Sequence, residues 1–350
     1  MRSLDLPTLN ALSFSTEQVA SLTALGEARG KQELFTRQRP ETLESMRQVA
    51  VIESSESSNR IEGITVARER VEALVLRPTE PRDRSEQEVA GYRDALALIH
   101  ESHAHMPLSN NVLLQLHGML YRYQPASGGR YKQADNSIVE RSPDGSVARV
   151  RFDTVSAVQT PGAMEQLTQR YTDAVGPHAV DPLIIVPLTI LDLLCIHPFT
   201  DGNGRVARLV TLLLLYHHGF EVGRYISLER IIEESKETYY EALEASSQGW
   251  HEGKHDPHPW LNYFWGFLLR AHSEFEERVS TLPTGRGSKT EQVKAAVGRR
   301  IEPFAISDIV RDCPGVSRDM IRLVLRELRD EGVIVLRGRG RGAKWLRKLS

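Results

Sequence analysis

This chain of 350 residues has little of what marks a secreted or a membrane protein. It contains only two cysteines, Cys195 and Cys313, which excludes a framework of several disulfides and favours a reducing compartment. No uninterrupted apolar run reaches the ~20 residues that a membrane-spanning helix needs. The residues from Met1 to Asp5 lack the apolar stretch of a signal peptide. These absences predict a cytoplasmic protein with no membrane partner.

Two other common patterns are missing as well. The sequence has no internal repeat and no phosphate loop of the GxxxxGK[ST] form. Its 40% hydrophobic and 26% charged residues are typical of a globular protein with room for two or three domains. The net charge of −2 hides an asymmetry, because residues 284–350 carry 16 Lys+Arg against 8 Asp+Glu and the remainder 28 against 38. We predict an N-terminal helical region over residues 1–85, a core domain over 86–280, a linker over 281–289 and a basic domain over 290–350.

The most informative segment runs from residue 197 to residue 208, with the sequence HPFTDGNGRVAR. Upstream, residues 183–196 are almost wholly apolar and predict a buried helix. Downstream, apolar residues recur at helical spacing and predict a second helix: Val206, Leu209, Val210, Leu213 and Leu214. Charged and glycine residues gathered between two core helices predict a binding site, because buried charge is costly unless it is paired.

The end of this segment has the residue types of a phosphate site. Gly202, Asn203 and Gly204 begin the second helix, where glycine lets an anion approach the free N–H groups closely. Arg205 and Arg208 follow within about one turn and project from neighbouring faces. Two fork-shaped cations beside a helix N-terminus suit a diphosphate or triphosphate better than a single carboxylate.

The start of the segment adds a metal-type ligand and a base. Asp201 offers a hard oxygen, and Mg2+ usually takes one or two protein carboxylates together with phosphate oxygens. His197 is the group here that exchanges a proton near neutral pH. The residues therefore predict a nucleotide-phosphate site with a base beside it. The whole segment resembles the HPFxDGNGRxxR signature of the Fic (Fic/Doc) family, with no departure from it.

The resemblance implies both a fold and a reaction. Fic enzymes are all-helical, and most are similar in transferring AMP from ATP to a hydroxyl side chain of a target protein. On this pattern His197 deprotonates the attacking Ser, Thr or Tyr, and Asp201 holds Mg2+ against the α- and β-phosphates. Residues 202–204 cradle the phosphates, Arg205 contacts the β-phosphate and Arg208 the γ-phosphate. The fold class implied is mainly α, with a helical core and a β-hairpin flap.

A second resemblance lies upstream. Residues 58–63 (SNRIEG) are similar to the (S/T)xxxE(G/N) inhibitory motif of self-restrained Fic proteins. Residues 42–62 predict a helix with a glycine just past its end. A glutamate in the last turn faces the negative end of the helix dipole, at a cost of about 0.3–1 kcal/mol, and Ser58 one turn earlier is predicted to steady it. We predict that Glu62 pairs with Arg208 and inhibits transfer by misaligning the phosphates of ATP.

Residues 128–152 resemble the flap of the same family. Two strand-like runs, residues 137–139 and 147–152, are separated by a Pro-Asp-Gly turn signal. A hairpin in a helical domain offers a free edge, and an extended segment of the target protein can pair with that edge. An ordinary surface hairpin is the alternative.

Two features follow the second core helix. Residues 227–243 predict one helix with an apolar stripe, and the resemblance implies that Tyr240 on it lies near the adenine, with core packing as the alternative. The run at residues 251–258 (HEGKHDPH) is rich in histidine, as a zinc site would be. Its glycine and proline and the lack of cysteine instead favour a solvated loop.

Residues 290–350 resemble a winged helix-turn-helix domain. Ser307 and Ser317 are the predicted N-caps of two helices that are joined by a turn at residues 314–316. The second helix has an apolar stripe, and its arginines fall largely on another side: Arg318, Arg322, Arg326 and Arg329. Residues 337–342 (RGRGRG) predict a wing that holds phosphates. The domain predicts DNA as a partner, with protein docking as the alternative.

The sequence leaves three functions open. The first is self-inhibited transfer of AMP to a target protein or to the chain itself, and the presence of His197 favours it. The second is an ATP-sensing, DNA-binding transcriptional regulator, and the third is removal of AMP from modified proteins by means of Glu62. A homodimer is in keeping with the family, although no residue here marks a dimer contact. The sequence names neither the target protein nor what relieves the inhibition.

Overall fold

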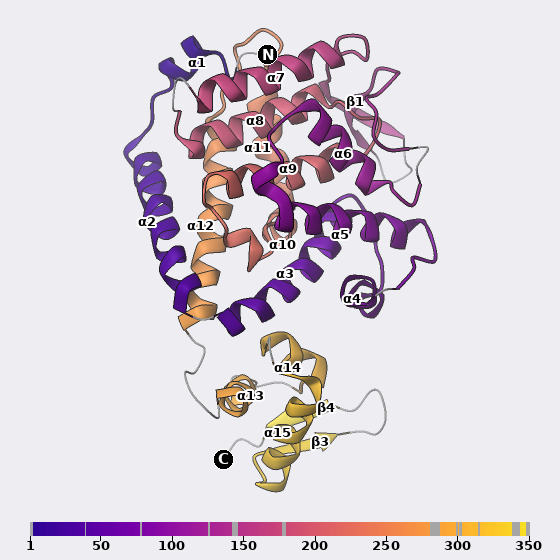
Figure 1. Cartoon of the computed structure of the whole chain (residues 1–350), viewed down its shortest axis with the longest axis vertical. Helices are drawn as coiled ribbons and strands as arrows, with labels where there is room; N and C mark the ends of the chain where they lie inside the picture. Colours follow the sequence, from indigo (N-terminus) through magenta and orange to yellow (C-terminus); the bar gives the residue numbers. More distant parts are fainter. Residues whose placement is uncertain are drawn as a thin grey trace. The chain divides into compact units, whose positions relative to one another are not determined.

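The computed structural model describes residues 3–38, 40–77, 79–124, 127–141, 146–176, 180–280, 288–298, 300, 303–313, 316–337 and 344–347. It is mainly helical with two small antiparallel hairpins, as the sequence predicts (Figure 1). The chain divides into two compact units, the first with Met1–Gln32 and Ala50–His272 and the second with Glu33–Val49 and Ser273–Ser350. The predicted domain limits stay predictions, and residues 281–287 of the predicted linker lie outside the described residues.

The elements up to residue 280 follow one another in this order: α1 (Leu6–Ala11), α2 (Thr16–Gln38), α3 (Pro40–Ile61), α4 (Arg68–Leu76), α5 (Arg84–Ser102), η1 (His103–His105), α6 (Asn110–Leu120), β1 (Ser137–Arg141), β2 (Val147–Asp153), α7 (Thr160–Val175), α8 (Pro182–Ile196), α9 (Asn203–His217), η2 (Val222–Arg224), α10 (Leu228–Glu234), α11 (Lys236–Ser247) and α12 (His258–Ser280). The helices α2, α3 and α12 each contribute residues to both units. The two predicted core helices are therefore α8 and α9, and the predicted inhibitory helix is α3.

Helix α8 is strongly apolar and almost entirely buried. Pro187 lies inside it and has no N–H to donate to the carbonyl of Leu183. The indole N–H of Trp265 in α12 donates to that carbonyl at 2.7 Å, and Trp260 donates to the carbonyl of Pro187 at 2.8 Å. The two tryptophans thus satisfy the carbonyls at the proline and fix α12 beside α8.

Within the described ranges, no helix is long and apolar enough to cross a membrane.

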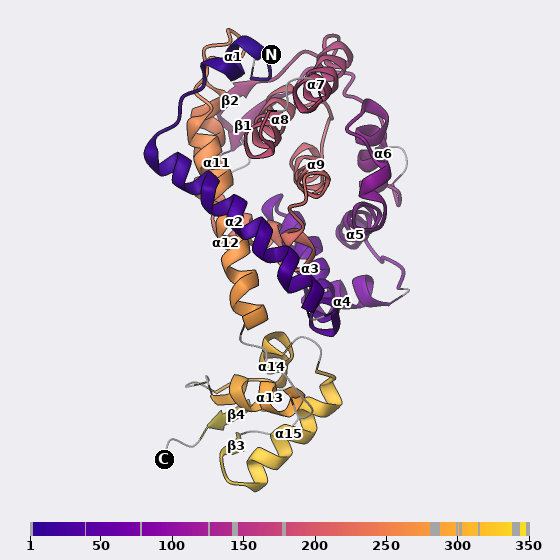
Figure 2. The ribbon, with the colours of Figure 1, turned by 60° about the vertical axis from the view of Figure 1, so that its left-hand side comes forward.

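Helix α9 lies at the centre of the first unit, with α8 on one side and α5 and α6 on another (Figures 1 and 2). It is buried almost throughout, and the buried residues of its first turns include Asn203, Arg205 and Arg208. A buried guanidinium costs free energy unless hydrogen bonds and a counter-charge compensate it. The start of α9 therefore requires partners from the surrounding elements.

Residues 228–247 form two helices where the sequence predicts one. Ser235, between α10 and α11, has φ −117° and ψ 31°, outside the helical region. Its hydroxyl donates to the carbonyl of Ile231 at 2.9 Å. Serine competes with the backbone for hydrogen bonds in this way, which accounts for the break. The break makes Lys236 the first residue of α11.

The hairpin of the first unit matches the predicted flap. Strands β1 and β2 pair antiparallel, with Ser137 opposite Asp153 and two register shifts along the ladder. Arg149 and Arg151 of β2 pair with Glu244 of α11 at 2.8 and 3.5 Å, which holds the hairpin against that helix. Residues 142–145, with the predicted Pro-Asp-Gly turn, lie outside the described residues.

The C-terminal part of the second unit has three helices and a hairpin, which are α13 (Ser288–Gly298), α14 (Ile306–Asp312), α15 (Arg318–Asp330), β3 (Ile334–Arg337) and β4 (Lys344–Arg347). They enclose one apolar core, to which Phe304, Leu325 and Ile334 contribute. Backbone hydrogen bonds between Phe304 and Trp345, at 2.9 and 2.7 Å, tie the segment before α14 to β4.

One of the two predicted caps in this part is right and the other is wrong. The hydroxyl of Ser317 accepts the N–H of Met320 at 3.3 Å and caps α15. Ser307 is not the cap of α14, because that helix begins one residue earlier and the Asp308 carboxylate accepts the N–H of Ala305 at 2.7 Å. Residues 314–315 of the predicted turn and residues 338–342 of the predicted wing lie outside the described residues, so the winged-helix assignment stays a prediction.

Candidate active site

The loop between α8 and α9 holds the predicted site residues in an unusual backbone conformation. His197 ends α8 with φ 53°, in the left-handed region, and Gly202 begins α9 with φ 79°. Asn203 closes the loop between them, since its side chain accepts from the N–H of Phe199 at 2.9 Å and donates to the carbonyl of Phe199 at 2.8 Å. The Phe199 ring is fully buried beneath the loop. The side chains of Asn203 and Phe199 therefore fix the loop, and His197 lies at its start, directly after α8.

His117 of α6 supports this loop from behind. Its ring stacks on Phe199 with centroids 3.8 Å apart. Its Nδ1 accepts the N–H of Gly129 at 3.0 Å, so Nε2 carries the hydrogen that reaches the carbonyl of Asp201 at 3.2 Å. Burial lowers the pKa of His117 to about 4, which keeps the ring neutral at physiological pH. His117 is thus a positioning residue for the loop.

Lys132 joins the same loop to the flap. Its Nζ donates to Asn136 Oδ1 at 2.7 Å and to Thr154 Oγ1 at 2.8 Å, at the two ends of the hairpin. It also donates to the carbonyl of Ile196 at 3.3 Å, next to His197. Burial lowers the pKa of Lys132 to about 8. One buried lysine therefore sets the flap relative to the base.

Arg205 is directed away from the loop opening. Its guanidinium is 1% exposed and donates to Glu88 of α5 at 2.6 Å. It also donates to the hydroxyl of Tyr121 at 2.9 Å, and that hydroxyl donates to Asp201 Oδ2 at 2.9 Å. These linked hydrogen bonds orient the Asp201 carboxylate. The contact of Arg205 with a β-phosphate, which the resemblance implies, stays a prediction, because the side chain packs behind the loop.

The Asp201 carboxylate itself reaches solvent, and its side chain is 65% exposed. The partial burial of Asp201 raises the pKa of its carboxyl group. The positive charge of Arg205 and the hydrogen bonds from the Tyr121 hydroxyl and the Gly202 N–H together lower this pKa by more, so it lies below the ordinary value. Asp201 is therefore ionised at neutral pH and open on one side. It has the properties of a single-carboxylate cation ligand.

A cavity of about 620 Å³ opens beside the loop. One part of its wall is apolar, with Leu191 and Leu194 of α8, Phe152 of β2 and Leu243 of α11. The other part is charged, and its residues are His197, Gly204, Arg208, Glu62 and Lys236. A cleft of this size with an apolar part and a few converging polar groups is typical of a small-molecule site. Tyr240 lines the cavity on α11, where the resemblance implies it, and its contact with adenine stays a prediction.

His197 has the protonation state of a base. Burial lowers its pKa to about 4, so the ring is neutral at pH 7. Its Nδ1 lies 3.3 Å from the carbonyl of Leu194, and because a carbonyl only accepts, Nδ1 carries the hydrogen. The lone pair of Nε2 is then left to accept a proton from a group in the cavity.

Glu62 and Arg208, which the sequence predicts to pair, lie 2.7 Å apart between Oε1 and Nη2. The Arg208 side chain is 3% exposed and the Glu62 side chain 31%. The predicted partner of Ser58, the Glu62 carboxylate, is wrong. The hydroxyl and the carbonyl of Ser58 both accept hydrogen bonds from Arg208, each at 2.9 Å. Ser58 precedes Glu62 by one turn, and its side chain points across to α9 rather than along α3. Serine and glutamate together hold one guanidinium.

Gly204 explains how the Glu62 carboxylate reaches the start of α9. A Cβ atom at this position would overlap Glu62 Oε1 and lie 3.2 Å from Arg208 Nη1. The carboxylate therefore rests on bare backbone at the helix N-terminus, between that backbone and a guanidinium. This is the arrangement that binds phosphates and other anions. We call Gly204 and Arg208 the anion cradle.

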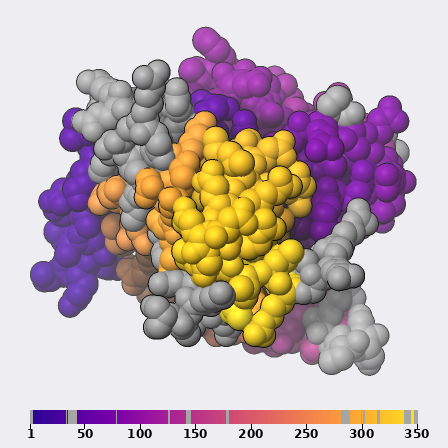
Figure 3. All heavy atoms as spheres, turned by 90° about the horizontal axis from the view of Figure 1, so that it is seen from below, coloured from indigo at the N-terminus to yellow at the C-terminus, as the bar shows by residue number. Residues whose placement is uncertain are grey.

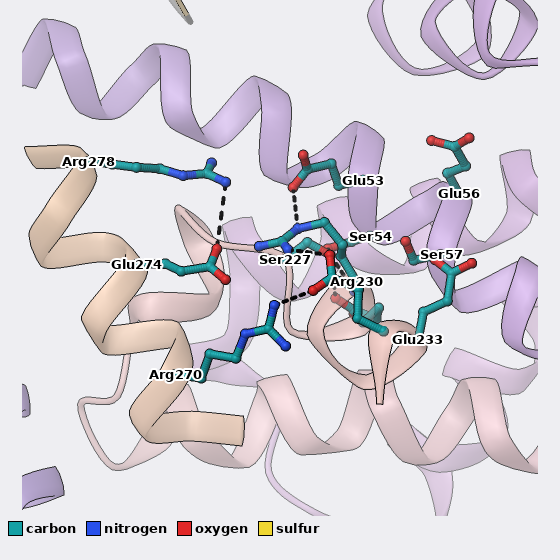
Figure 4. Close-up of polar contacts among 12 residues, drawn as sticks. Glu53, Ser54, Glu56, Ser57, Ser227, Arg230, Glu233, Arg270, Glu274 and Arg278 are labelled. Atoms are coloured by element: carbon teal, nitrogen blue, oxygen red, sulfur yellow. Dashed lines mark hydrogen bonds and ion pairs between the residues drawn. The ribbon is translucent and has the colours of Figure 1, made fainter. Parts of the chain in front are cut away.

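The last turns of α3 dock on α10 through polar side chains (Figure 4). Residues 53–59 (ESSESSN) are all buried, and none is a large apolar residue. Glu53 accepts from Arg230 at 3.2 Å, and Ser54 donates to Glu229 at 2.7 Å. Arg60 makes a bidentate pair with Glu233 at 2.7 and 2.9 Å. Directional hydrogen bonds and ion pairs, rather than apolar area, hold this part of α3 in place.

Lys236 is a site residue that the sequence interpretation missed. Its Nζ donates to the carbonyl of Ile61 at 2.6 Å, so it satisfies the end of α3, and it also lines the cavity. No local pattern indicates this role, because the sequence predicts one helix over residues 227–243 and the break that makes Lys236 the first residue of α11 appears in the structure alone. Residues 251–257 form a loop of turns and irregular backbone, as the sequence predicts.

Residues 107–215 match the model of the Fic/DOC family. Among curated relatives, Protein adenylyltransferase Fic of Nematostella vectensis is 25% identical over 203 residues, which cover 55% of this chain and 42% of the relative. Protein adenylyltransferase fic-1 of Caenorhabditis briggsae is 28% identical over 137 residues, which cover 37% of this chain and 24% of the relative. The chain thus spans less than half the length of either relative.

Solved structures show the same fold. A Fic family protein from Desulfovibrio desulfuricans G20 gives a TM-score of 0.62 at 20% identity, over 96% of this chain and 97% of that one. A fragment of Fic-1 from C. elegans gives a TM-score of 0.58 at 20% identity, over 75% of this chain and 74% of that one. The family match covers the loop at 197–208 and its supports His117 and Tyr121. On its sequence match and its fold, the chain contains a Fic/DOC family domain over residues 107–215.

Proposed function

We propose that this chain transfers AMP from ATP to a hydroxyl side chain of a target protein. The observation that carries the proposal is the anion cradle, in which a carboxylate already rests on Gly204 and Arg208 in the same cavity as His197. A base beside an anion site is what transfer of a phosphate-containing group to a hydroxyl requires. The two curated relatives that carry the name protein adenylyltransferase support AMP as the group.

The two parts of the cavity wall support one orientation of ATP in this proposal. Its apolar part, between Leu194 and Phe152, suits the adenine, and its charged part suits the phosphates. With the terminal phosphate at Arg208, the α-phosphate comes toward His197. His197 Nε2 takes the proton of the hydroxyl as its oxygen bonds to the α-phosphorus. The bond from that phosphorus to the bridging oxygen of the β-phosphate then breaks, and pyrophosphate leaves.

Asp201 fits a role as ligand of Mg2+. It is ionised, open to solvent and oriented by Tyr121, and no cluster of described residues supplies a complete metal site. One carboxylate suffices when the phosphates of the nucleotide provide the other oxygens, as is common for Mg2+. When bound, the cation would reduce the negative charge on the phosphates. Asp201, on the same loop as His197, would hold it.

Glu62 supplies an inhibitory contact in this proposal. Its carboxylate takes the place in the cradle that suits the terminal phosphate of ATP. ATP that enters beside it places its phosphates out of line with the hydroxyl, and transfer falls steeply with misplacement. The same carboxylate lines the cavity with His197, which keeps removal of AMP as the alternative use of the site.

The flap is the proposed docking place of the target protein. In the part of the chain that the structure describes, it is a two-stranded sheet, so each strand has one edge without a strand partner. An extended segment of the target can pair with such an edge through backbone hydrogen bonds. Lys132 and Glu244 fix the hairpin relative to the cavity, which would bring the target hydroxyl to His197.

The position of the radiolabel in ATP tests the reaction class. With Mg2+ and the Glu62→Gly chain, label from the α-phosphate should appear on protein and label from the γ-phosphate should not. Label from the γ-phosphate would instead show phosphoryl transfer. ATP binding without label from either position would support the regulator that senses ATP, and the enzyme proposal would be abandoned.

Replacement of Lys236 by methionine tests how the end of α3 is held. Methionine keeps about the same side-chain length and removes the ammonium group that donates to the carbonyl of Ile61. Losing a charge-assisted hydrogen bond of about 1.5–3 kcal/mol should loosen α3 and raise AMP transfer about tenfold when Glu62 is present. In the Glu62→Gly chain no rise is expected, because the inhibitory carboxylate is already absent.

The measurement compares the rates of α-label incorporation in both backgrounds. Lys236→Arg should behave like the unaltered chain, and Lys254→Met is the control at an exposed lysine. An equal fall of the rate in both backgrounds would mean that Lys236 serves the nucleotide and not α3.

A further inference from the structure

Helix α15 presents a fixed and unusually charged surface. Its apolar side chains are buried in the core of the C-terminal elements: Ile321, Val324, Leu325 and Leu328. Ser317 caps its start. Figure 3 shows the C-terminal residues, in yellow, as one continuous mass rather than an extended tail. The orientation of α15 about its own axis is therefore set by packing, and its remaining faces are available to a partner.

The charges on these faces are segregated by sign. The four arginines of α15 are all exposed: Arg318, Arg322, Arg326 and Arg329. At 3.6 residues per turn they fall within an arc of about 80° and extend over about 16 Å of helix. The acidic residues occupy the next arc, of about 80° as well, and are exposed too: Asp319, Glu327 and Asp330. One flank of α15, the arginine flank, is therefore purely basic.

The surroundings of the arginine flank carry the same sign. Residues 284–350 hold 16 Lys+Arg against 8 Asp+Glu. In the hairpin, Arg337 of β3 pairs with Lys344 of β4 in the ladder, and both residues are exposed. Helix α14 packs against α15 immediately before it. A capped helix with a helix before it and a basic hairpin after it is how several DNA-binding modules present a recognition helix.

We propose that the arginine flank of α15 binds duplex DNA, with the helix in the major groove. The groove is about 12 Å wide and admits one helix, and arginine binds both phosphate oxygens and the edge of guanine in a bidentate manner. A row of guanidiniums along one side of a helix matches the row of phosphates along one strand. An acidic protein surface is the other class of partner for such charge, and it offers no comparable linear row.

Two of the arginines already have local carboxylate partners, and these pairs do not block the flank. Arg322 pairs with Asp319 at 2.9 Å and Arg329 with Asp330 at 2.7 Å, and the two arginine side chains are 51% and 47% exposed. Exposed ion pairs of this kind contribute little and are screened by salt. Phosphates can therefore replace the carboxylates, and the acidic residues then limit affinity for DNA.

Fluorescence anisotropy of the full chain with a labelled duplex of about 24 base pairs, at about 50 mM salt and upward, tests the proposal. The unaltered chain should bind, with an affinity that falls linearly on a log–log plot against salt. Arg322→Gln with Arg326→Gln should weaken binding at least tenfold and reduce that slope by about 2. Asp319→Asn with Glu327→Gln should strengthen binding a few-fold.

Arg122→Gln with Lys254→Gln is the matched control, because it removes the same charge from exposed positions of the first unit. It should leave binding unchanged. Equal weakening in the control would show general attraction by net charge and overturn the assignment to α15. No binding by the unaltered chain would overturn the proposal and favour a protein partner. The inference goes beyond AMP transfer and does not rest on it, so a chain with His197→Asn, which keeps the backbone conformation at this position, should bind the duplex like the unaltered chain.

Discussion

Replacement of Glu62 by glycine is expected to raise the rate of AMP transfer about a hundredfold, the factor that misplacement of a reacting group by about 1 Å can cost. The carboxylate lies 2.7 Å from Arg208 and rests on the backbone of Gly204. Its removal leaves the Arg208 side chain, which is 3% exposed, with its two hydrogen bonds to Ser58 and without a counter-charge in the cavity that faces it. The terminal phosphate of ATP can then take the place of the carboxylate and bring the α-phosphate into line.

The variant should also respond differently to ATP in a thermal melt. A buried cation that loses its counter-charge destabilises the fold, and a ligand that restores the charge stabilises it. ATP with Mg2+ should therefore raise the Tm of the Glu62→Gly chain more than that of the unaltered chain. The two readouts are independent, because the melt requires no target protein.

Two further variants separate the charge of Glu62 from the flexibility that glycine adds. Glu62→Gln keeps the side chain and removes its charge, so it should activate transfer in part. Glu80→Gly introduces glycine at an exposed position outside the helices and should have no effect. Unchanged labelling and unchanged ATP affinity in Glu62→Gly would end the inhibition proposal while leaving AMP transfer itself open.

The parts of the fold that the sequence predicted well are those decided locally. The apolar run at residues 183–196 matches α8 to within one residue, because a helix that is covered on all sides needs little beyond its own composition. The left-handed Gly63 after α3 and the antiparallel flap follow from local signals of the same kind. The site at residues 197–208 could be predicted because its functional residues lie close together in the sequence.

What the sequence did not predict depends on partners far along the chain. Glu88 and Tyr121, which hold Arg205 and Asp201, lie on α5 and just after α6, and no local pattern relates them to the loop. The spacing of Ser58 and Glu62 puts both on one side of α3, but the guanidinium of Arg208 decides where the serine points. Burial and side-chain direction at the start of α9 are set by packing, which a one-dimensional pattern does not contain.

Loss of His197 is expected to reduce AMP transfer by a factor of about 10² to 10⁴, the usual contribution of a general base, while ATP affinity stays unchanged. The imidazole lines the cavity with its pKa lowered to about 4 by burial, so it is neutral and able to accept a proton throughout the physiological range. Among the described residues, Ser58 and Glu62 hold Arg208 of the anion cradle, and no hydrogen bond joins Arg208 to His197. The change should therefore appear in the chemical step and not in binding.

The backbone at this position decides which substitution gives a clear answer. His197 has φ 53°, a conformation in which alanine is strained and asparagine is well tolerated. His197→Asn should therefore fold as the unaltered chain does and still lose transfer, whereas His197→Ala carries an additional cost in stability. Both are measured in the Glu62→Gly background by α-label incorporation and by ATP titration, with His105→Ala as the exposed histidine control. Transfer that survives in His197→Asn at the full rate would show that another group takes the proton of the hydroxyl.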